Sequence, residues 1–103
     1  MSENLLNLVN TIRDRKNKDK DKDKSYTSSL LSGGLSKCID KMEEEFDELK
    51  EALNDKSNIV HEAADTIYHI LVTLEAADIK FEDVLKELED RKKQSGIEEK
   101  NNR

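Results

Sequence analysis

The sequence predicts an all-α fold, and three observations favour it: the composition, the absence of proline and the helical spacing of the apolar residues. Charged residues make up 41% of the chain and aromatic residues 4%, and neither proline nor tryptophan occurs. A β-sandwich would require many β-branched and aromatic residues in strands separated by turn residues. The 103 residues amount to one domain with a small core, because a chain of this size hides only roughly 60–65% of the surface of its unfolded form.

The first predicted helix covers residues 2–12, with Ser2 as its N-cap. The alternating lysines and aspartates of residues 16–24 can bury almost nothing, so we expect a solvated tether or a frayed extension of that helix. A short capped helix over residues 25–31 follows, and a Ser-Gly-Gly sequence at 32–34 ends it. The apolar residues that predict the first helix are Leu5, Leu8, Val9 and Ile12.

Two longer helices form the centre of the predicted fold. An amphipathic helix over residues 35–54 carries a heptad seam of apolar residues, and a turn over 54–58 offers a cap to the next helix. That next helix, over residues 59–77, has apolar side chains on nearly every face, so it belongs in the centre of a bundle or at an oligomer interface. The seam of the 35–54 helix consists of Leu35, Ile39, Met42, Phe46, Leu49 and Leu53.

A last helix over residues 81–91, ended by Gln-Ser-Gly at 94–96, completes a four-helix-type bundle. No run of about 18 apolar residues occurs, which excludes a membrane-spanning helix. The amino terminus lacks the pattern of a signal peptide, and the single cysteine, Cys38, cannot form an internal disulfide. We therefore expect a cytoplasmic protein in which Cys38 is a small packing residue.

The charge is unevenly distributed along the chain. Residues 13–24 hold seven basic and four acidic residues, whereas residues 40–65 hold ten acidic and three basic ones, within a total charge of −6. An acidic core disfavours binding to nucleic acid, since duplex binding depends on the neutralisation of phosphates. A dense acidic block is either a solvated helix face or a site for divalent cations.

Helical rotation places three carboxylates on one flank of the 35–54 helix. At about 100° per residue, Glu44, Glu45 and Glu48 lie beside the apolar seam together with Lys37 and Lys41. The glutamates are three and four residues apart, so their like charges repel and cost helix stability in the absence of a cation. One interpretation remains that these residues form only a charged outer face interleaved with lysines.

The 59–77 helix adds acidic groups to an otherwise apolar surface. Glu62, Asp65 and His69 lie within about 60° of one another on it. Buried carboxylates need a cation, a salt bridge or a hydrogen-bond network, and Lys41 of the preceding helix is one candidate partner. Antiparallel packing of the two helices would bring five carboxylates together, more than one lysine balances. They are Glu44, Glu45, Glu48, Glu62 and Asp65.

A pair of hard divalent cations would balance this charge, and oxygen-only ligands favour Mg²⁺ or Mn²⁺. A di-iron bundle would require Glu-x-x-His on two helices, and neither His61 nor His69 has a glutamate three residues before it. We keep three interpretations of His69: a metal ligand, a partner of Asp65, or a histidine of the core. Tyr26 is interpreted as a packing residue or as a residue that stacks on a base.

The acidic motif resembles that of a known superfamily. Glu44-Glu45-x-x-Glu48, followed after thirteen residues by Glu62-x-x-Asp65, resembles the metal signature of the MazG-like all-α NTP pyrophosphohydrolases. The flanking residues narrow the resemblance to the phosphoribosyl-ATP pyrophosphatase family over residues 25–103, after a lead-in of residues 1–24. Glu43 stands where that family usually has glycine. The flanking segments are Ser25-Tyr26-Thr27, Tyr68-His69 and Gln94-Ser95-Gly96.

The resemblance implies hydrolysis of the α–β phosphoanhydride of 1-(5-phospho-β-D-ribosyl)-ATP to the AMP adduct and pyrophosphate, the second step of histidine biosynthesis. It implies that the five carboxylates are catalytic Mg²⁺ ligands, with Mn²⁺ as a substitute, and that one of them takes the proton of the attacking water. It further implies a homodimer, with other histidine-pathway enzymes as candidate partners. Expected phosphate contacts are Lys37 and Lys41, and for the 5′-phosphate Lys100 and Arg103.

Two rival functions stay open at this point. A MazG-like house-cleaning enzyme would share the metal site and act on free nucleotides. A non-enzymatic helical interaction module would use the acidic helices only as solvated faces.

Overall fold

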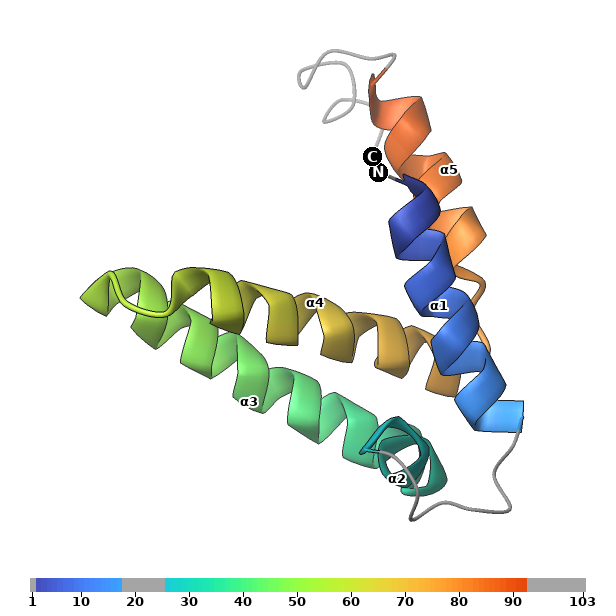
Figure 1. Ribbon diagram of the computed structural model, residues 1–103, viewed down its shortest axis with the longest axis horizontal. Coiled ribbons are helices and arrows are strands. Elements are labelled where there is room, and N and C mark those ends of the chain that lie inside the picture. Colours follow the sequence, from blue (N-terminus) through green and yellow to red (C-terminus); the bar gives the residue numbers. More distant parts are fainter. Residues whose placement is uncertain (1, 18–25, 93–103) are drawn as a thin grey trace.

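The computed structural model describes residues 2–17 and 26–92, and in them every regular element is a helix (Figure 1). The all-α prediction is confirmed. Of the tether predicted over 16–24, residues 16 and 17 belong to the first helix, and residues 18–24 lie outside the described residues, as do the cap at Ser25 and the chain end at 94–96. No described helix is both long enough and apolar enough to cross a membrane. The helices are α1 (Ser2–Asn17), α2 (Tyr26–Ser32), α3 (Gly34–Asp55), α4 (Ile59–Ala76) and α5 (Phe81–Lys92).

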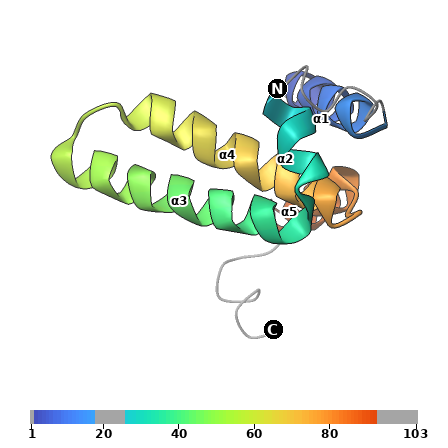
Figure 2. The same cartoon turned by 90° about the horizontal axis from the view of Figure 1, so that it is seen from below.

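Helices α3 and α4 form a long antiparallel hairpin whose register is fixed by two buried threonines (Figures 1 and 2). The hydroxyl of Thr66 donates to the carbonyl oxygens of Glu62, at 2.8 Å, and of Glu45 on the facing helix, at 3.1 Å. Seven residues later, the hydroxyl of Thr73 donates to the carbonyl oxygens of His69, at 2.6 Å, and of Cys38, at 3.2 Å. Each threonine therefore joins the two helices at positions two turns apart.

The face of α3 that packs on α4 differs from the predicted apolar seam. The buried residues of α3 are Cys38 and Ala52, and Glu45 lies midway between them at the same seven-residue spacing. The small side chains of Cys38 and Ala52 allow the two helices to approach closely enough for the hydrogen bonds of the threonines. The predicted seam is instead left partly exposed, with Phe46 42% and Leu53 52% accessible.

The turn between α3 and α4 is formed by backbone in the left-handed region rather than by a side-chain cap. Lys56 has φ 57° and its N–H donates to the carbonyl oxygen of Ala52, which closes α3. Asn58 has φ 56° and makes no side-chain capping hydrogen bond, so the cap predicted within residues 54–58 is wrong in this respect. A capping side chain needs an extended backbone to reach the first amides of the helix, and the left-handed conformation of Asn58 does not supply it.

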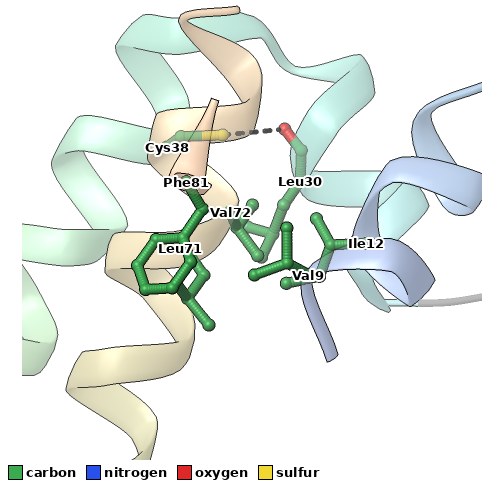
Figure 3. Close-up of a cluster of buried hydrophobic side chains, with 7 residues drawn as sticks. All are labelled: Val9, Ile12, Leu30, Cys38, Leu71, Val72 and Phe81. Carbon is green, nitrogen blue, oxygen red and sulfur yellow. Dashed lines mark hydrogen bonds between the residues drawn. The ribbon is translucent and has the colours of Figure 1, made fainter. Parts of the chain in front are cut away.

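The core gathers at one end of the hairpin, where all five described helices contribute a buried side chain (Figure 3). Cys38 is a packing residue there, as expected, with its Sγ 3.4 Å from the carbonyl oxygen of Leu30. The opposite end of the hairpin has no other described helix against it (Figures 1 and 2). The core residues are Val9, Ile12, Leu30, Cys38, Leu71, Val72 and Phe81.

Ion pairs fasten α1 to the junction of α4 and α5. The guanidinium of Arg13 donates to both carboxylate oxygens of Glu82, at 2.8 and 3.2 Å, and to Glu75 at 3.3 Å. The ammonium of Lys16 donates to the carbonyl oxygen of Glu75 at 2.8 Å and pairs with Asp78. A two-pronged guanidinium–carboxylate contact is the strongest common form of ion pair.

This arrangement predicts a loss of stability in acid that depends on Glu82. The hydrogen bond from Arg13 lowers the pKa of Glu82 from 4.5 to about 2. Because the folded-state pKa lies below the unfolded one, ionised Glu82 stabilises the fold above about pH 4.5, and this contribution is lost as the pH falls toward about 2. We expect Glu82→Gln to lower Tm at pH 7 and to flatten the fall of Tm between pH 4.5 and 2, as followed by circular dichroism.

The control is Glu87→Gln, since Glu87 is exposed on the same helix. Equal pH profiles for the Glu82 and Glu87 variants would show that the Arg13 contact contributes nothing to folding.

Candidate metal and active site

The first group of clustered carboxylates lies within the α3–α4 hairpin. Glu45 and Glu48 of α3 and Glu62 of α4 each offer an oxygen atom, and these atoms lie within 4.8 Å of one another. The threonine-fixed register produces this meeting, because Thr66 bonds the carbonyl of Glu45 and lies one turn after Glu62. The predicted juxtaposition of acidic residues from both helices is therefore present.

A second group extends the first along α4. His61, Glu62 and Asp65 have potential ligand atoms within 4.8 Å of one another, and His61 Nε2 lies 3.2 Å from Asp65 Oδ2. Glu62 belongs to both groups, so the acidic surface is continuous. Sequence reasoning gave His61 no place in the site, although its spacing of four residues from Asp65 already puts the two on one helical face.

Glu44 lies apart from these groups. Its carboxylate is exposed and pairs with Lys41, with 3.2 Å between Nζ and Oε2. One residue along a helix is a rotation of about 100°, so Glu44 cannot face α4 when its neighbour Glu45 does. Glu43 is also exposed and belongs to neither group.

The cluster combines buried carboxylate oxygens with raised pKa values. In the described residues, Glu45 Oε2 and Glu62 Oε2 are buried and have no hydrogen-bond partner. Burial, followed by repulsion from Glu48, raises the pKa of Glu45. Burial and the neighbouring Glu48 also raise the pKa of Glu62. Lys41, the candidate partner for this charge, pairs instead with Glu44. Orphaned oxygen atoms of this kind fit an oxygen-ligated divalent cation such as Mg²⁺ or Mn²⁺.

His69 and Tyr26 border the acidic surface. The ring of His69 is 4% exposed, with Nδ1 2.9 Å from the carbonyl oxygen of Asp65 and Nε2 3.0 Å from the hydroxyl of Tyr26. Both ring nitrogens are thus engaged, which disfavours a metal ligand. Because the ring is buried and its contact with Asp65 is to the main-chain carbonyl, the structure favours the interpretation of His69 as a histidine of the core. Tyr26 is 56% exposed and so is not a core residue.

The predicted phosphate contacts are only partly described. Lys41 lies at the edge of the cluster, near Tyr26 and Glu45, and Lys37 is exposed one turn earlier on α3. Lys100 and Arg103 lie outside the described residues.

Comparison with known proteins identifies the family of this chain. Residues 5–92 match the family described as phosphoribosyl-ATP pyrophosphohydrolase. The chain belongs to this family. The resemblance inferred from the acidic motif is thereby confirmed, and the match also takes in α1 from residue 5 onward.

Relatives of the family align over most of their length. The chain is 45% identical to a phosphoribosyl-ATP pyrophosphatase of Roseobacter denitrificans, over 93% of this chain and 91% of the relative. It is 43% identical to one of Paracoccus denitrificans, over 93% and 89%. The phosphoribosyl-ATP pyrophosphatase of Rhizobium etli is 46% identical over 77% of this chain and 76% of its own length. No solved structure matches the chain.

The buried charge predicts that removing one carboxylate stabilises the metal-free protein. Glu45→Gln removes an unpartnered charge and its repulsion from Glu48, so in EDTA we expect a Tm equal to that of the unsubstituted protein or a few degrees higher. Millimolar Mg²⁺ or Mn²⁺ should raise Tm in the unsubstituted protein, since a ligand at a hundred times its Kd stabilises by about 2.7 kcal/mol. The rise should be smaller in the variant. Thermal melts with and without metal measure both effects.

Glu43→Gln is the matched control, because Glu43 is an exposed glutamate of the same helix. A lower Tm of metal-free Glu45→Gln would mean that Glu45 is a structural partner in the fold, contrary to this prediction.

Proposed function

We propose that this chain hydrolyses the α–β phosphoanhydride of 1-(5-phospho-β-D-ribosyl)-ATP with Mg²⁺, releasing pyrophosphate in the second step of histidine biosynthesis. The observation that supports this most directly is the meeting of Glu45, Glu48 and Glu62, two of which have buried oxygen atoms without partners. Membership of the phosphoribosyl-ATP pyrophosphohydrolase family supports the choice of substrate.

The residues of the cluster have distinct environments that suit distinct tasks. The orphaned oxygens of Glu45 and Glu62 are the best candidates to hold a cation, together with Asp65. When bound, Mg²⁺ would neutralise the triphosphate and lower the pKa of an attacking water. Glu48 is more exposed than the other two glutamates of its group, so it is best placed to accept a proton from water.

The lysines at the edge of the site suit contact with phosphate. Lys41 is held by Glu44 at 3.2 Å, so its ammonium lies beside the cluster without being buried in it. Positioning and charge stabilisation supply most of the catalysis in phosphoryl transfer, which a carboxylate cage with a few lysines can provide. Glu44 then has an indirect role, through Lys41. Lys37, Lys100 and Arg103 remain proposed contacts on the strength of the family resemblance.

The decisive experiment measures pyrophosphate release from phosphoribosyl-ATP with Mg²⁺, with EDTA and with a panel of free nucleotides. We expect metal-dependent release from phosphoribosyl-ATP and little from ATP or dNTPs. Release from free nucleotides alone would indicate a house-cleaning enzyme, and no release at all would contradict an enzymatic role.

A single substitution links this activity to the cluster. Asp65→Asn keeps the size of the side chain and removes a charge from the second group, so we expect turnover to fall by at least about a hundredfold. Asp47→Asn is the matched control, since Asp47 is exposed on α3 and pairs only with Lys50 among the described ion pairs. Equal turnover in both variants would exclude Asp65 from the site.

We also propose that the chain acts as a homodimer through one face of the hairpin. Exposed apolar residues of α3 and α4 lie on the face opposite to Asp65 and His61, by helical rotation. The exposed apolar residues are Ile39, Phe46, Leu53, Val60 and Ile67.

This proposal predicts that a charge on the apolar face separates the dimer. Val60 is 84% exposed, so Val60→Glu should fold as well as the unsubstituted chain and yet be monomeric by light scattering coupled to size exclusion. Leu88→Glu is the control, because Leu88 is equally apolar and half exposed on α5. A dimer that survives Val60→Glu would place the interface elsewhere.

A further inference from the structure

The hydrogen bonds of His69 determine which way the Tyr26 hydroxyl donates. A backbone carbonyl can only accept, so the contact of His69 Nδ1 with the carbonyl of Asp65, at 2.9 Å, places the ring proton on Nδ1. In the neutral ring Nε2 is then an acceptor. The Tyr26 hydroxyl, 3.0 Å from Nε2, must therefore donate its only proton to His69.

The surroundings hold this arrangement in place. Tyr26 and His69 meet edge to face, with ring centroids 5.8 Å apart, and Tyr68 also meets His69 edge to face, at 5.4 Å. The hydroxyl of Thr27, next to Tyr26, bonds that of Tyr68. Partial burial raises the pKa of Tyr26, although Lys41 opposes the shift, so the phenol keeps its proton.

Tyr26 also lies beside the carboxylate cluster. Its charged neighbours are Lys41, Glu45 and Asp65, which border or form the carboxylate cluster. More than half of its surface is exposed, although its hydroxyl is tied to a buried histidine. A molecule at the cluster that contacts the phenolic oxygen would therefore meet lone pairs and no proton.

This polarity selects the kind of group that Tyr26 can contact. Ionised phosphate oxygens only accept hydrogen bonds, so they cannot bond an oxygen whose proton is committed to His69. The hydrogen-bond donors of a nucleotide are its ribose hydroxyls and the N–H groups of its base.

We propose that Tyr26 positions the substrate by accepting a hydrogen bond from a hydroxyl of the ribose that carries the triphosphate, and that His69 positions Tyr26. This inference rests on the proposed function, because it takes phosphoribosyl-ATP to be the substrate bound at the cluster. It adds a contact to the nucleoside part of the substrate, beside the cluster that holds the phosphates.

The test is a steady-state comparison of four proteins at pH 8, where an ordinary imidazole is neutral. Tyr26→Phe keeps the ring and removes the oxygen, so we expect KM for phosphoribosyl-ATP to rise about five- to tenfold, the value of one hydrogen bond, with kcat changed less than twofold. His69→Asn loses the acceptor at the position of Nε2 and should show the same rise. His69→Gln places an amide oxygen there and should recover most of the loss.

Two additions separate positioning from a purely structural role. The double variant Tyr26→Phe with His69→Asn should have the KM of either single variant, since both remove the same contact. The comparison is repeated with two substrates, one without the 2′-hydroxyl and one without the 3′-hydroxyl of that ribose. For one of these two substrates, Tyr26→Phe should no longer raise KM. Ser32→Ala on the same short helix is the control for general disturbance of α2.

Several results would overturn the proposal. An unchanged KM in Tyr26→Phe with a large loss in Tyr26→Ala would show stacking instead of hydrogen bonding. A rise in KM that persists with both deoxy substrates would show a base N–H or a water as the donor. If His69→Asn fails to fold, the KM of Tyr26→Phe still tests the proposal, because Tyr26 is exposed and its substitution should not prevent folding. Failure of the proposed function has a different signature, because the unsubstituted protein would then release no pyrophosphate from phosphoribosyl-ATP.

Discussion

The register of α3 against α4 is the constraint on which the rest of this structure depends. Two threonine hydroxyls bridge to main-chain carbonyls of the facing helix, and the positions they join are seven residues apart on both helices. Because Cys38 and Ala52 are small, the backbones approach closely there, and Glu45 lies between them in the same contact face. A shift of one residue would rotate Glu45 by about 100° and move it away from Glu62. The site is therefore a consequence of helix packing.

The same packing makes the metal-free hairpin costly at its centre. A carboxylate in a helix–helix interface loses hydration, and here Glu45 and Glu62 each keep one buried oxygen without a partner. A hydrophobic residue at either position would stabilise the hairpin and would remove a proposed cation ligand. The fold offsets this cost at the other end, where all five described helices share one core and Arg13 fastens α1 to α4 and α5. Stability and chemistry thus occupy different ends of α4.

Much of the fold followed from the sequence, whereas the choice of packing face did not. Periodicity and breakers placed the ends of α2 to α5 within one residue, because apolar spacing and glycine act locally. Helix α1 runs five residues past its predicted end at residue 12, since the ion pairs of Arg13 and Lys16 continue it. The heptad seam from Leu35 to Leu53 was the more apolar stripe, yet α4 packs on the stripe of Cys38, Glu45 and Ala52. The hydrophobicity of a stripe measures its transfer free energy. It takes no account of the close helix approach that small side chains allow, or of the hydrogen bonds of the threonines. The wrong packing face also put Glu44 with the cluster. His61 was overlooked although its four-residue spacing from Asp65 was visible in the sequence.

The surroundings of the site differ on its two sides. The buried His69 joins the site to the core, whereas the apolar seam of α3 is exposed. On the core side, α2 is anchored by Leu30, and its first residue, Tyr26, reaches the acidic surface through His69. On the open side nothing in the described chain covers Phe46 or the cleft at the hairpin turn. The exposed seam is the face that we propose for dimerisation, and by helical rotation it lies opposite to Asp65 and His61. One packing register sets both faces, because the rotation that turns Glu45 toward α4 turns Phe46 about 100° away from it.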